Sequence, residues 1–313
     1  MGEIGPRELR LMQGLAQEVT ARDPALLNGD ATVGELAWMW GQTFDRFHPF
    51  WRHRMWFVED RLVGWGWAVM PHRIPLEDGS VRESKQANLI FQVHPDQPKL
   101  LNEILDWYDE QAGDVGRSVI IQSADTAALP IVVAHGFEFD TEAADDDDGD
   151  WVQFNSRDLV DVAEPVLPDG FRFVSAADVS VGEAVNAHRG AWHPVALREL
   201  DLERVQATWP YRPDLHVLVE APDATLAATA IVWFDEANGT AEFEPVGTHR
   251  DHRRQGLGTA LQLHGMRLAR AAGATRMLVA CAGANSDPAA RDLYYGVGFQ
   301  PITRDLPYSK VAS

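Results

Sequence analysis

A glycine-containing loop between a strand and a helix places the strongest constraint on this chain. A strand is predicted over residues 241–246, and Thr248 to Gly258 follows it, directly before a segment with helical spacing. Glycines let the backbone approach a ligand closely, and the first turn of a helix has N–H groups without intrahelical partners. Such a loop binds anions, usually phosphate. The pattern Arg-x-x-Gly-x-Gly differs from the dinucleotide fingerprint and from the P-loop, which requires Gly-Lys-Ser/Thr.

A second pattern lies downstream of this loop. Residues 277–282 have the composition of a buried strand, and Asn285 follows in a turn. Ala290, Tyr294 and Gly298-Phe299 then complete the pattern Ala-x-x-x-Tyr-x-x-x-Gly-Phe. The ordered pair of patterns resembles the GNAT N-acetyltransferase superfamily, whose glycine loop holds the pyrophosphate of acetyl-CoA. The spacing from Asn285 to Ala290 is two residues longer than the usual family spacing.

The resemblance implies acetyl-CoA as a co-substrate and assigns roles to individual residues. It makes Tyr294 the acid that protonates the CoA sulfur, and Tyr295, about 100° around the helix, is the alternative. The residues that it implies in CoA binding are Val246, Gly247, Thr248, Arg253, Arg254, Gln255, Gly256, Leu257, Gly258, Thr259, Asn285 and Tyr294.

Attack by an amine also requires a group that accepts a proton. Alternation along the strand places Glu242, Glu244, Val246 and Thr248 on one face, so Glu244 or Glu242 is a candidate base. The same glutamates are equally expected to bind a cationic substrate or to face solvent. His193 is a second route to a base. We predict no metal site, because His249 and His252 have no carboxylate or thiol partner at a liganding spacing.

The order of predicted elements occurs twice in the chain. Aligning Val93-His94-Pro95 with Thr248-His249-Arg250 places Pro98, Leu101 and Glu103 on Arg253, Gly256 and Gly258, and aligning Gly136 with Gly298 places Val132 on Tyr294. Proline removes an N–H donor, leucine fills the space for phosphate, and glutamate repels it. The first copy is therefore predicted to lack the phosphate loop and the acid, and to act as a scaffold or to shape a substrate cleft.

The repeat predicts an α/β fold of two tandem GNAT-like domains, each a mostly antiparallel mixed sheet flanked by helices. A length of 313 residues suits two domains. We predict a degenerate domain at 1–160, which lacks the phosphate loop, and an acetyl-CoA-binding catalytic domain at 165–313. Residues 151–154 are expected to form a returning strand, and the acidic run 145–150 a solvated loop.

Composition excludes several classes of function. The formal net charge is −20, with 13 basic and 28 acidic residues in the first 160, and this argues against nucleic-acid binding. No apolar run approaches the roughly 18–20 residues of a membrane span. The single cysteine, Cys281, fits a cytoplasmic protein and a buried packing position. Eight of the eleven tryptophans lie in the first half, where they pack in the core or line a pocket for an apolar or cationic acceptor.

These observations predict an N-acetyltransferase that moves an acetyl group from acetyl-CoA to the amine of a small or peptide acceptor by direct attack on the thioester. The two-copy architecture is similar to that of mycothiol synthase, and aminoglycosides, polyamines, amino acids and protein N-termini are other acceptors. A monomer or a homodimer is expected. The alternative from a different class is a non-catalytic CoA-binding sensor or interaction protein, in which the acceptor cleft is closed.

Overall fold

We describe the protein from a computed structural model that covers residues 4–76, 78–195 and 197–312. The α-helices in these residues are α1 (Pro6–Arg22), α2 (Val33–Phe47), α3 (Leu100–Ala112), α4 (Ala128–Ala134), α5 (Val181–Trp192), α6 (Glu199–Gln206), α7 (Leu257–Ala271) and α8 (Ala289–Gly296). The strands of the first half are β1 (Trp51–Val58), β2 (Arg61–Val69), β3 (His72–Pro75), β4 (Val81–Ser84), β5 (Ala87–Val93), β6 (Arg117–Gln122), β7 (Glu138–Phe139) and β8 (Val152–Asp158). Those of the second half are β9 (Arg172–Ser175), β10 (His216–Glu220), β11 (Leu226–Asp235), β12 (Thr240–Thr248), β13 (Arg276–Ala282) and β14 (Gln300–Lys310). No helix in the described ranges is long and apolar enough to cross a membrane.

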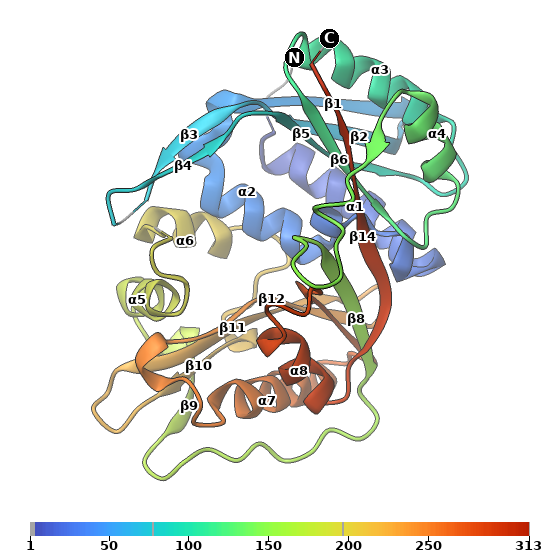
Figure 1. Ribbon diagram of the computed structural model, residues 1–313. Helices are drawn as coiled ribbons and strands as arrows, with labels where there is room; N and C mark the ends of the chain where they lie inside the picture. Colours follow the sequence, from blue (N-terminus) through green and yellow to red (C-terminus); the bar gives the residue numbers. More distant parts are fainter. Residues whose placement is uncertain (1–3, 77, 196, 313) are drawn as a thin grey trace.

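One continuous sheet runs through both halves, in the order β1-β2-β5-β6-β14-β8-β13-β12-β11-β10-β9. Among the described residues only the pairs β5–β6 and β12–β13 are parallel, so the predicted mixed and mostly antiparallel sheet of each half is confirmed. The halves are joined because they exchange their last strands. β8 pairs with β13 of the second half, whereas β14 pairs with β6 of the first (Figure 1). Since both strands pair across the predicted boundary, the division at 1–160 and 165–313 stays a prediction.

Helices cover both faces of the sheet in each half (Figure 1). In the first half, α1 and α2 lie over Trp65 and Trp67, and α3 and α4 cover the opposite face around Phe91. In the second half, α5 and α6 lie over Trp233, and α7 and α8 cover the face that carries Phe243. Each half therefore has two apolar layers around its part of the sheet.

α2 is the element that both halves share, and it lies between them (Figure 1). Its residues Leu36 and Trp40 are buried in the first half, whereas Trp38 is buried against α5 and α6. Gly34 permits the close approach of α2 to β11, because a Cβ atom at this position would collide with the indole ring of Trp233. A site that includes β12 is therefore bordered by the first half of the chain.

The structure confirms the internal repeat at the residues that were aligned. The N–H of His94 donates to Val63 O at 2.8 Å, and the N–H of His249 donates to Ala227 O at 2.9 Å. At the other end of the repeat, the N–H groups of Phe137 and Phe299 donate to Val132 O and Tyr294 O, at 3.3 and 3.1 Å. The two copies thus share backbone geometry at positions where their side chains differ.

Candidate active site

A gap between two parallel strands forms the centre of the candidate site. β12 and β13 pair only over Thr240–Phe243 and Arg276–Val279, and they part beyond these residues. Residues 244–248 of β12 therefore keep β11 on one edge and have no paired strand on the other, within the part of the chain that is described. Unpaired backbone groups at such an edge bind an extended ligand arm like an added strand. Val246, Gly247 and Thr248 border this gap.

A β-bulge lies where the strands part, and it corrects one prediction. Val232 is opposite Phe243 and Ala230 is opposite Val246, so Glu244 and Pro245 together face the single residue Ile231. The extra residue breaks the alternation. Glu242, opposite Trp233, therefore faces α2, whereas Val246 faces α7. The prediction that Glu242, Glu244, Val246 and Thr248 share one face was wrong for this reason.

The loop after β12 forms an open N-terminus for α7. Gly256 is the N-cap of the helix with φ of 80°, and Arg254 also has a positive φ of 66°. Left-handed residues at this spacing turn backbone N–H groups of a loop toward one side, which is the geometry of an anion site. A Cβ atom on Gly256 would meet no atom within 4 Å. Gln255, Leu257, Gly258 and Thr259 complete the turn around this open space.

Tyr294 lies on α8 beside the gap. Its side chain is only 7% exposed, and its ring packs edge-on against Phe299 with centroids 5.8 Å apart. Burial raises its pKa, and the neighbouring Glu244 and Cys281 raise it further. These two neighbours belong to β12 and β13, one on each side of the gap. The phenol stays protonated at neutral pH and is available as a donor there.

Comparison with known proteins agrees with this arrangement. Residues 183–299, which include the gap, the glycine loop and Tyr294, match the acetyltransferase (GNAT) family model. The second half is a GNAT acetyltransferase domain. No curated protein matches the chain.

Solved structures extend the likeness to the whole chain as a fold. A tandem GNAT protein from the clavulanic acid biosynthesis pathway has a TM-score of 0.60 at 15% identity, over 100% of this chain and 97% of that one. A GCN5-related N-acetyltransferase from Sphaerobacter thermophilus has a TM-score of 0.57 at 15% identity, over 98% and 93%. A GNAT acetyltransferase from Colwellia psychrerythraea has a TM-score of 0.56 at 13% identity, over 95% and 94%. The fold is that of tandem GNAT proteins, and the likeness to mycothiol synthase stays a prediction.

Glu244 stands at the point where the GNAT strands part. Its carbonyl accepts a hydrogen bond from Trp233 Nε1 at 2.5 Å, and its side chain is partly buried. Burial raises the pKa of Glu244 to about 8, and the charges of Glu242 and Asp30 contribute. A carboxyl group with a pKa near neutral accepts a proton from an amine more readily than an ordinary glutamate does. Tyr294 and Glu244 are electrostatic neighbours, so the structure brings the two predicted groups together.

Glu242 has a different environment. It is 6% exposed, and it accepts hydrogen bonds from Thr32 Oγ1 at 2.6 Å and from the backbone N–H of Gly34 at 3.1 Å. Burial raises its pKa to about 7 although these two bonds lower it. Glu242 thus binds the N-terminus of α2, where a helix stabilises negative charge. Its contacts favour a role in holding α2 against the GNAT domain, while its role as a base stays a prediction.

The first half supplies two carboxyl groups that the sequence did not assign to the site. Burial raises the pKa of Glu35 well above its usual range, and Glu244, Asp30 and Glu242 add to the effect. The pKa of Asp30 is raised by burial as well. The only local signal was Thr32-x-x-Glu35, a helix N-terminal pattern that Thr32 fulfils by accepting the N–H of Glu35 at 3.0 Å. That pattern predicts where a helix begins and not which surface the helix meets.

Other predicted site residues have protein partners. Arg253 Nη2 donates to Ala191 O at 2.9 Å, which ties the glycine loop to the end of α5. Asn285 Nδ2 donates to Asp147 at 3.0 Å, so this side chain contacts the acidic loop of the first half. Tyr295 accepts a hydrogen bond from Gln153 Nε2 at 2.7 Å and is 38% exposed. The roles of Arg253 and Asn285 in CoA binding stay predictions.

The histidines named as candidates lie around the loop. His249 Nδ1 accepts the N–H of Asp251 at 3.2 Å, and its ring lies 5.7 Å from that of His252. His193 is exposed at the end of α5 and is an electrostatic neighbour of Asp78 in the β3–β4 turn. The β3–β4 hairpin of the first half therefore reaches the rim of the GNAT domain.

The residues at the glycine loop fit the phosphates of CoA. The fit rests on Gly256, whose positive φ and open Cβ side leave room above the start of α7. The first-turn N–H groups of a helix bind phosphate oxygens there. When bound, acetyl-CoA supplies the activated acetyl group, and the residues that would hold it are the edge of β12 and the loop from Arg253 to Thr259.

Proposed function

We propose that this protein transfers an acetyl group from acetyl-CoA to a primary amine, with the second half as the catalytic domain and the first half as a wall of the acceptor site. The observation that carries the proposal is the position of Glu244 and Tyr294 beside the gap of a GNAT domain, where the charge of Glu244 raises the pKa of the Tyr294 phenol. One group has a pKa of about 8 and accepts protons, and the other keeps its proton.

The two groups divide the proton transfers. The bound ammonium group first releases one proton to solvent, and the neutral amine then attacks with its lone pair. Glu244 takes the second proton, which the nitrogen loses as the C–N bond forms. The new C–N bond replaces the C–S bond of the thioester, and Tyr294 gives its proton to the leaving sulfur. Exchange with water then returns both side chains to their starting states. The protein thus avoids both a cationic product and a free thiolate.

The test is a screen of amine acceptors with acetyl-CoA and the full chain, followed by release of the free thiol. Calorimetry with acetyl-CoA alone runs in parallel. Binding together with thiol release that requires an amine supports the proposal. Binding without transfer to any amine would indicate the CoA-binding sensor instead, and no binding would contradict both functions.

A further inference from the structure

A cavity of about 320 Å³ lies between α2 and the sheet of the first half. Phe47 of α2, Trp51 of β1 and Trp67 of β2 line it, and the rings of Trp51 and Trp67 meet edge-on with centroids 4.6 Å apart. Nε1 of Trp67 has no hydrogen-bond partner among the described residues. Small-molecule sites commonly have volumes of about 300–1,000 Å³ and aromatic walls. The cavity is therefore large enough for a small aromatic ligand.

The inner end of this cavity is lined by the start of the segment that contacts β12. Asp30 lines the cavity together with Ile90 of β5. From Asp30 the chain runs directly to Thr32 and Gly34, which hydrogen-bond to Glu242 on β12. Asp30 and Glu35 also lie close enough to Glu244 for their charges to interact with its carboxyl group. The segment from Asp30 to Glu35 thus leads from the aromatic cavity to the proposed base.

The outer end opens beside the β3–β4 hairpin. Val69 and Asn88 form a cross-strand pair there, and both line the cavity. Arg82 and Ser84 of β4 lie at the same end, and Arg82 is exposed. The cavity therefore has an acidic inner end, aromatic walls and a basic residue at its mouth.

We propose that this cavity binds the body of the acceptor, which is a primary amine on an aromatic group of one or two rings. The proposal rests on the proposed function. The ammonium group faces the carboxyl groups of Asp30, Glu35 and Glu244, which accept hydrogen bonds from it and ionise beside a positive charge, and the ring lies between Phe47, Trp51 and Trp67. Arylalkylamines and aromatic amino acids share this chemistry. In an amino acid the carboxylate is bonded to the same carbon as the ammonium group and would lie among Asp30, Glu35 and Glu244, so the acidic inner end favours arylalkylamines.

The first experiment compares acceptors with the full chain and saturating acetyl-CoA. The probes are 2-phenylethylamine, phenylalanine and putrescine, which is an amine without an aromatic body. We expect kcat/KM to be at least roughly tenfold higher for an aromatic probe than for putrescine, because burial of an apolar ring favours binding. A preference for 2-phenylethylamine over phenylalanine assigns the acceptor as an arylalkylamine, whereas a preference for phenylalanine would contradict an acidic inner end.

The second experiment uses variants of the cavity. Asp30→Asn should raise the KM of the preferred aromatic amine roughly 10- to 100-fold, since a charge-assisted hydrogen bond is lost. The pH at which kcat reaches half its maximum should fall, because Asp30 contributes to the raised pKa of Glu244. Ser84→Trp should raise KM by filling the half-buried mouth of the cavity. Glu103→Gln is the control: it removes an exposed carboxylate on α3, which covers the opposite face of the sheet.

The outcomes separate this inference from the proposed function. Unchanged affinity for acetyl-CoA in all three variants shows that the domain remains folded. If transfer proceeds but Asp30→Asn and Ser84→Trp leave KM unchanged, or putrescine equals the aromatic probes, the cavity is not the acceptor site and the transferase function stands. If the unmodified protein neither binds acetyl-CoA nor releases thiol with any amine, the proposed function itself is wrong.

Discussion

The two copies of the fold share a framework residue but differ in the loop that follows it. In both copies a histidine directly follows the strand before the loop, and its Nδ1 accepts the N–H of an aspartate two residues on, at 3.2 Å in each case. The sequence then continues as Asp96-Gln97-Pro98 in the first copy and as Asp251-His252-Arg253 in the second. The same backbone contact therefore occurs in a copy whose loop lacks the glycines and the arginine of the second copy.

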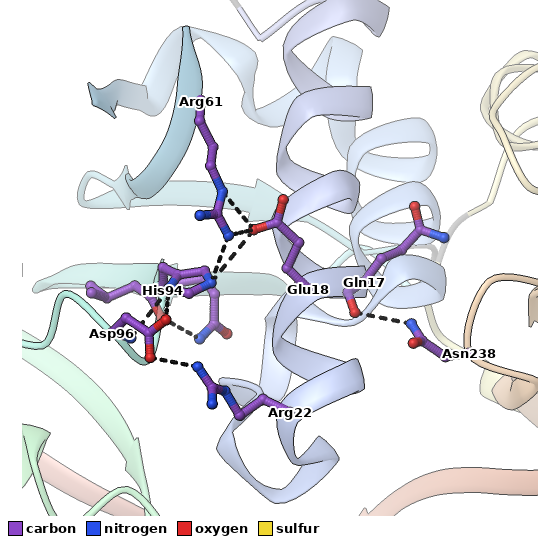
Figure 2. A network of polar contacts seen from close by, with 9 residues as sticks. Gln17, Glu18, Arg22, Arg61, His94, Asp96 and Asn238 are labelled. Carbon is purple, nitrogen blue, oxygen red and sulfur yellow. Dashed lines mark hydrogen bonds and ion pairs between the residues drawn. The ribbon is translucent and has the colours of Figure 1, made fainter. Parts of the chain in front are cut away.

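The surroundings of the two histidines explain the difference in chemistry. In the first copy, Nε2 of His94 lies 3.6 Å from Glu18, and Glu18 binds Arg61 while Asp96 binds Arg22, so the end of the strand is tied to α1 (Figure 2). In the second copy, His249 packs beside Gly190 of α5 and the loop beyond it is open. The first copy uses these positions for internal ion pairs.

The two copies also differ in what lies in the gap between their two parting strands. In the first copy β5 and β6 pair only over Ala87–Leu89 and Arg117–Val119. The chain itself contacts both strands beyond that point, because the N–H of Asn28 donates to Gln92 Oε1 at 2.9 Å and its Nδ2 donates to Ile120 O at 2.8 Å. The remaining cavity of about 220 Å³ is lined by apolar residues such as Leu26 and Leu101. A segment of the protein thus lies against both strands and satisfies the Ile120 carbonyl, where the second copy leaves its strand edge for a ligand.

The largest expected effect is at Tyr294, the position that Val132 occupies in the first copy. Tyr294→Phe should lower kcat by about 10²–10⁴-fold, because a positioned acid contributes this much and the phenyl ring preserves the packing against Phe299. Acetyl-CoA affinity should change little. Steady-state kinetics and calorimetry measure both. A kcat equal to that of the unmodified protein would assign Tyr294 the packing role of Val132 and direct the search for the acid to Tyr295.

Glu244 should control the pH dependence of the second copy. A base must be deprotonated, so kcat should rise with pH through about 8, where burial and the charges of Glu242 and Asp30 place the pKa of Glu244. Glu244→Gln should remove this limb and lower kcat by about 10²–10³-fold. A limb that persists in the variant would belong to another group, and His193 would be the next candidate.

The same residue should make the fold less stable at high pH. The raised pKa means that the native state retains a proton that the unfolded chain loses near its ordinary value, so this contribution is full below pH 4.5 and is lost as pH rises through about 8. Glu244→Gln should therefore lose less stability than the unmodified protein between pH 6 and 9. Urea unfolding at both pH values measures the difference, and equal losses would indicate that Glu244 is not desolvated.

The glycine loop provides the sharpest test between the copies. Asparagine and aspartate both tolerate the left-handed conformation of Gly256, and they differ only in charge. Gly256→Asp should weaken acetyl-CoA binding by roughly 10- to 100-fold more than Gly256→Asn, because its carboxylate competes with phosphate for the N–H groups of α7. Acetyl-CoA at 100 times its Kd should stabilise the unmodified protein by about 2.7 kcal/mol, and Gly256→Asp should keep about 1.4 kcal/mol of this gain or less at the same concentration. Equal effects of both variants would show that the loop is not the phosphate site.

Stoichiometry tests the first copy directly. Calorimetric titration should give one acetyl-CoA per chain, since Pro98, Leu101 and Glu103 stand where the second copy has Arg253, Gly256 and Gly258. Leu101 is buried in the first turn of α3 and Pro98 has no N–H to donate. A value near two would break the distinction between the copies.

The sequence predicted the elements of both copies and the position of Tyr294, because these depend on local patterns. It did not predict that β8 and β14 exchange partners. Strand composition specifies that a segment pairs and leaves open which sheet receives it, so only tertiary packing decides the exchange. The sequence did contain a signal for the bulge at Glu244-Pro245, because proline inside a strand favours a bulge. The prediction assumed strict alternation along the strand, and it therefore placed Val246 on the wrong face of the sheet.

The acidic residues of the first half were beyond sequence reasoning for a different reason. Asp30 and Glu35 reach the site because α2 packs on β11 and β12 through Gly34, a contact between residues about 200 positions apart in the chain. Nothing local to Asp30 encodes that neighbour. The excess of tryptophans in the first half was visible, yet only the structure separates Trp51 and Trp67, which line the cavity, from Trp65, which does not.

The smallest expected effect concerns the framework that both copies share. His94→Ala and His249→Ala each remove the acceptor for an aspartate N–H, so each should lower the free energy of unfolding by about 0.5–1.5 kcal/mol. His94→Ala should be the larger loss, because its ring also lies beside Glu18. Asparagine is a good N-terminal cap and should restore part of the stability in both cases. Only His249→Ala should also weaken acetyl-CoA binding, by a few-fold, because His249 begins the loop that leads to Gly256. Urea unfolding and calorimetry on the four variants separate stability from binding. A loss of acetyl-CoA affinity in His94→Ala would mean that the first copy influences the cofactor site. The division between a structural loop after His94 and a ligand-binding loop after His249 would then be wrong.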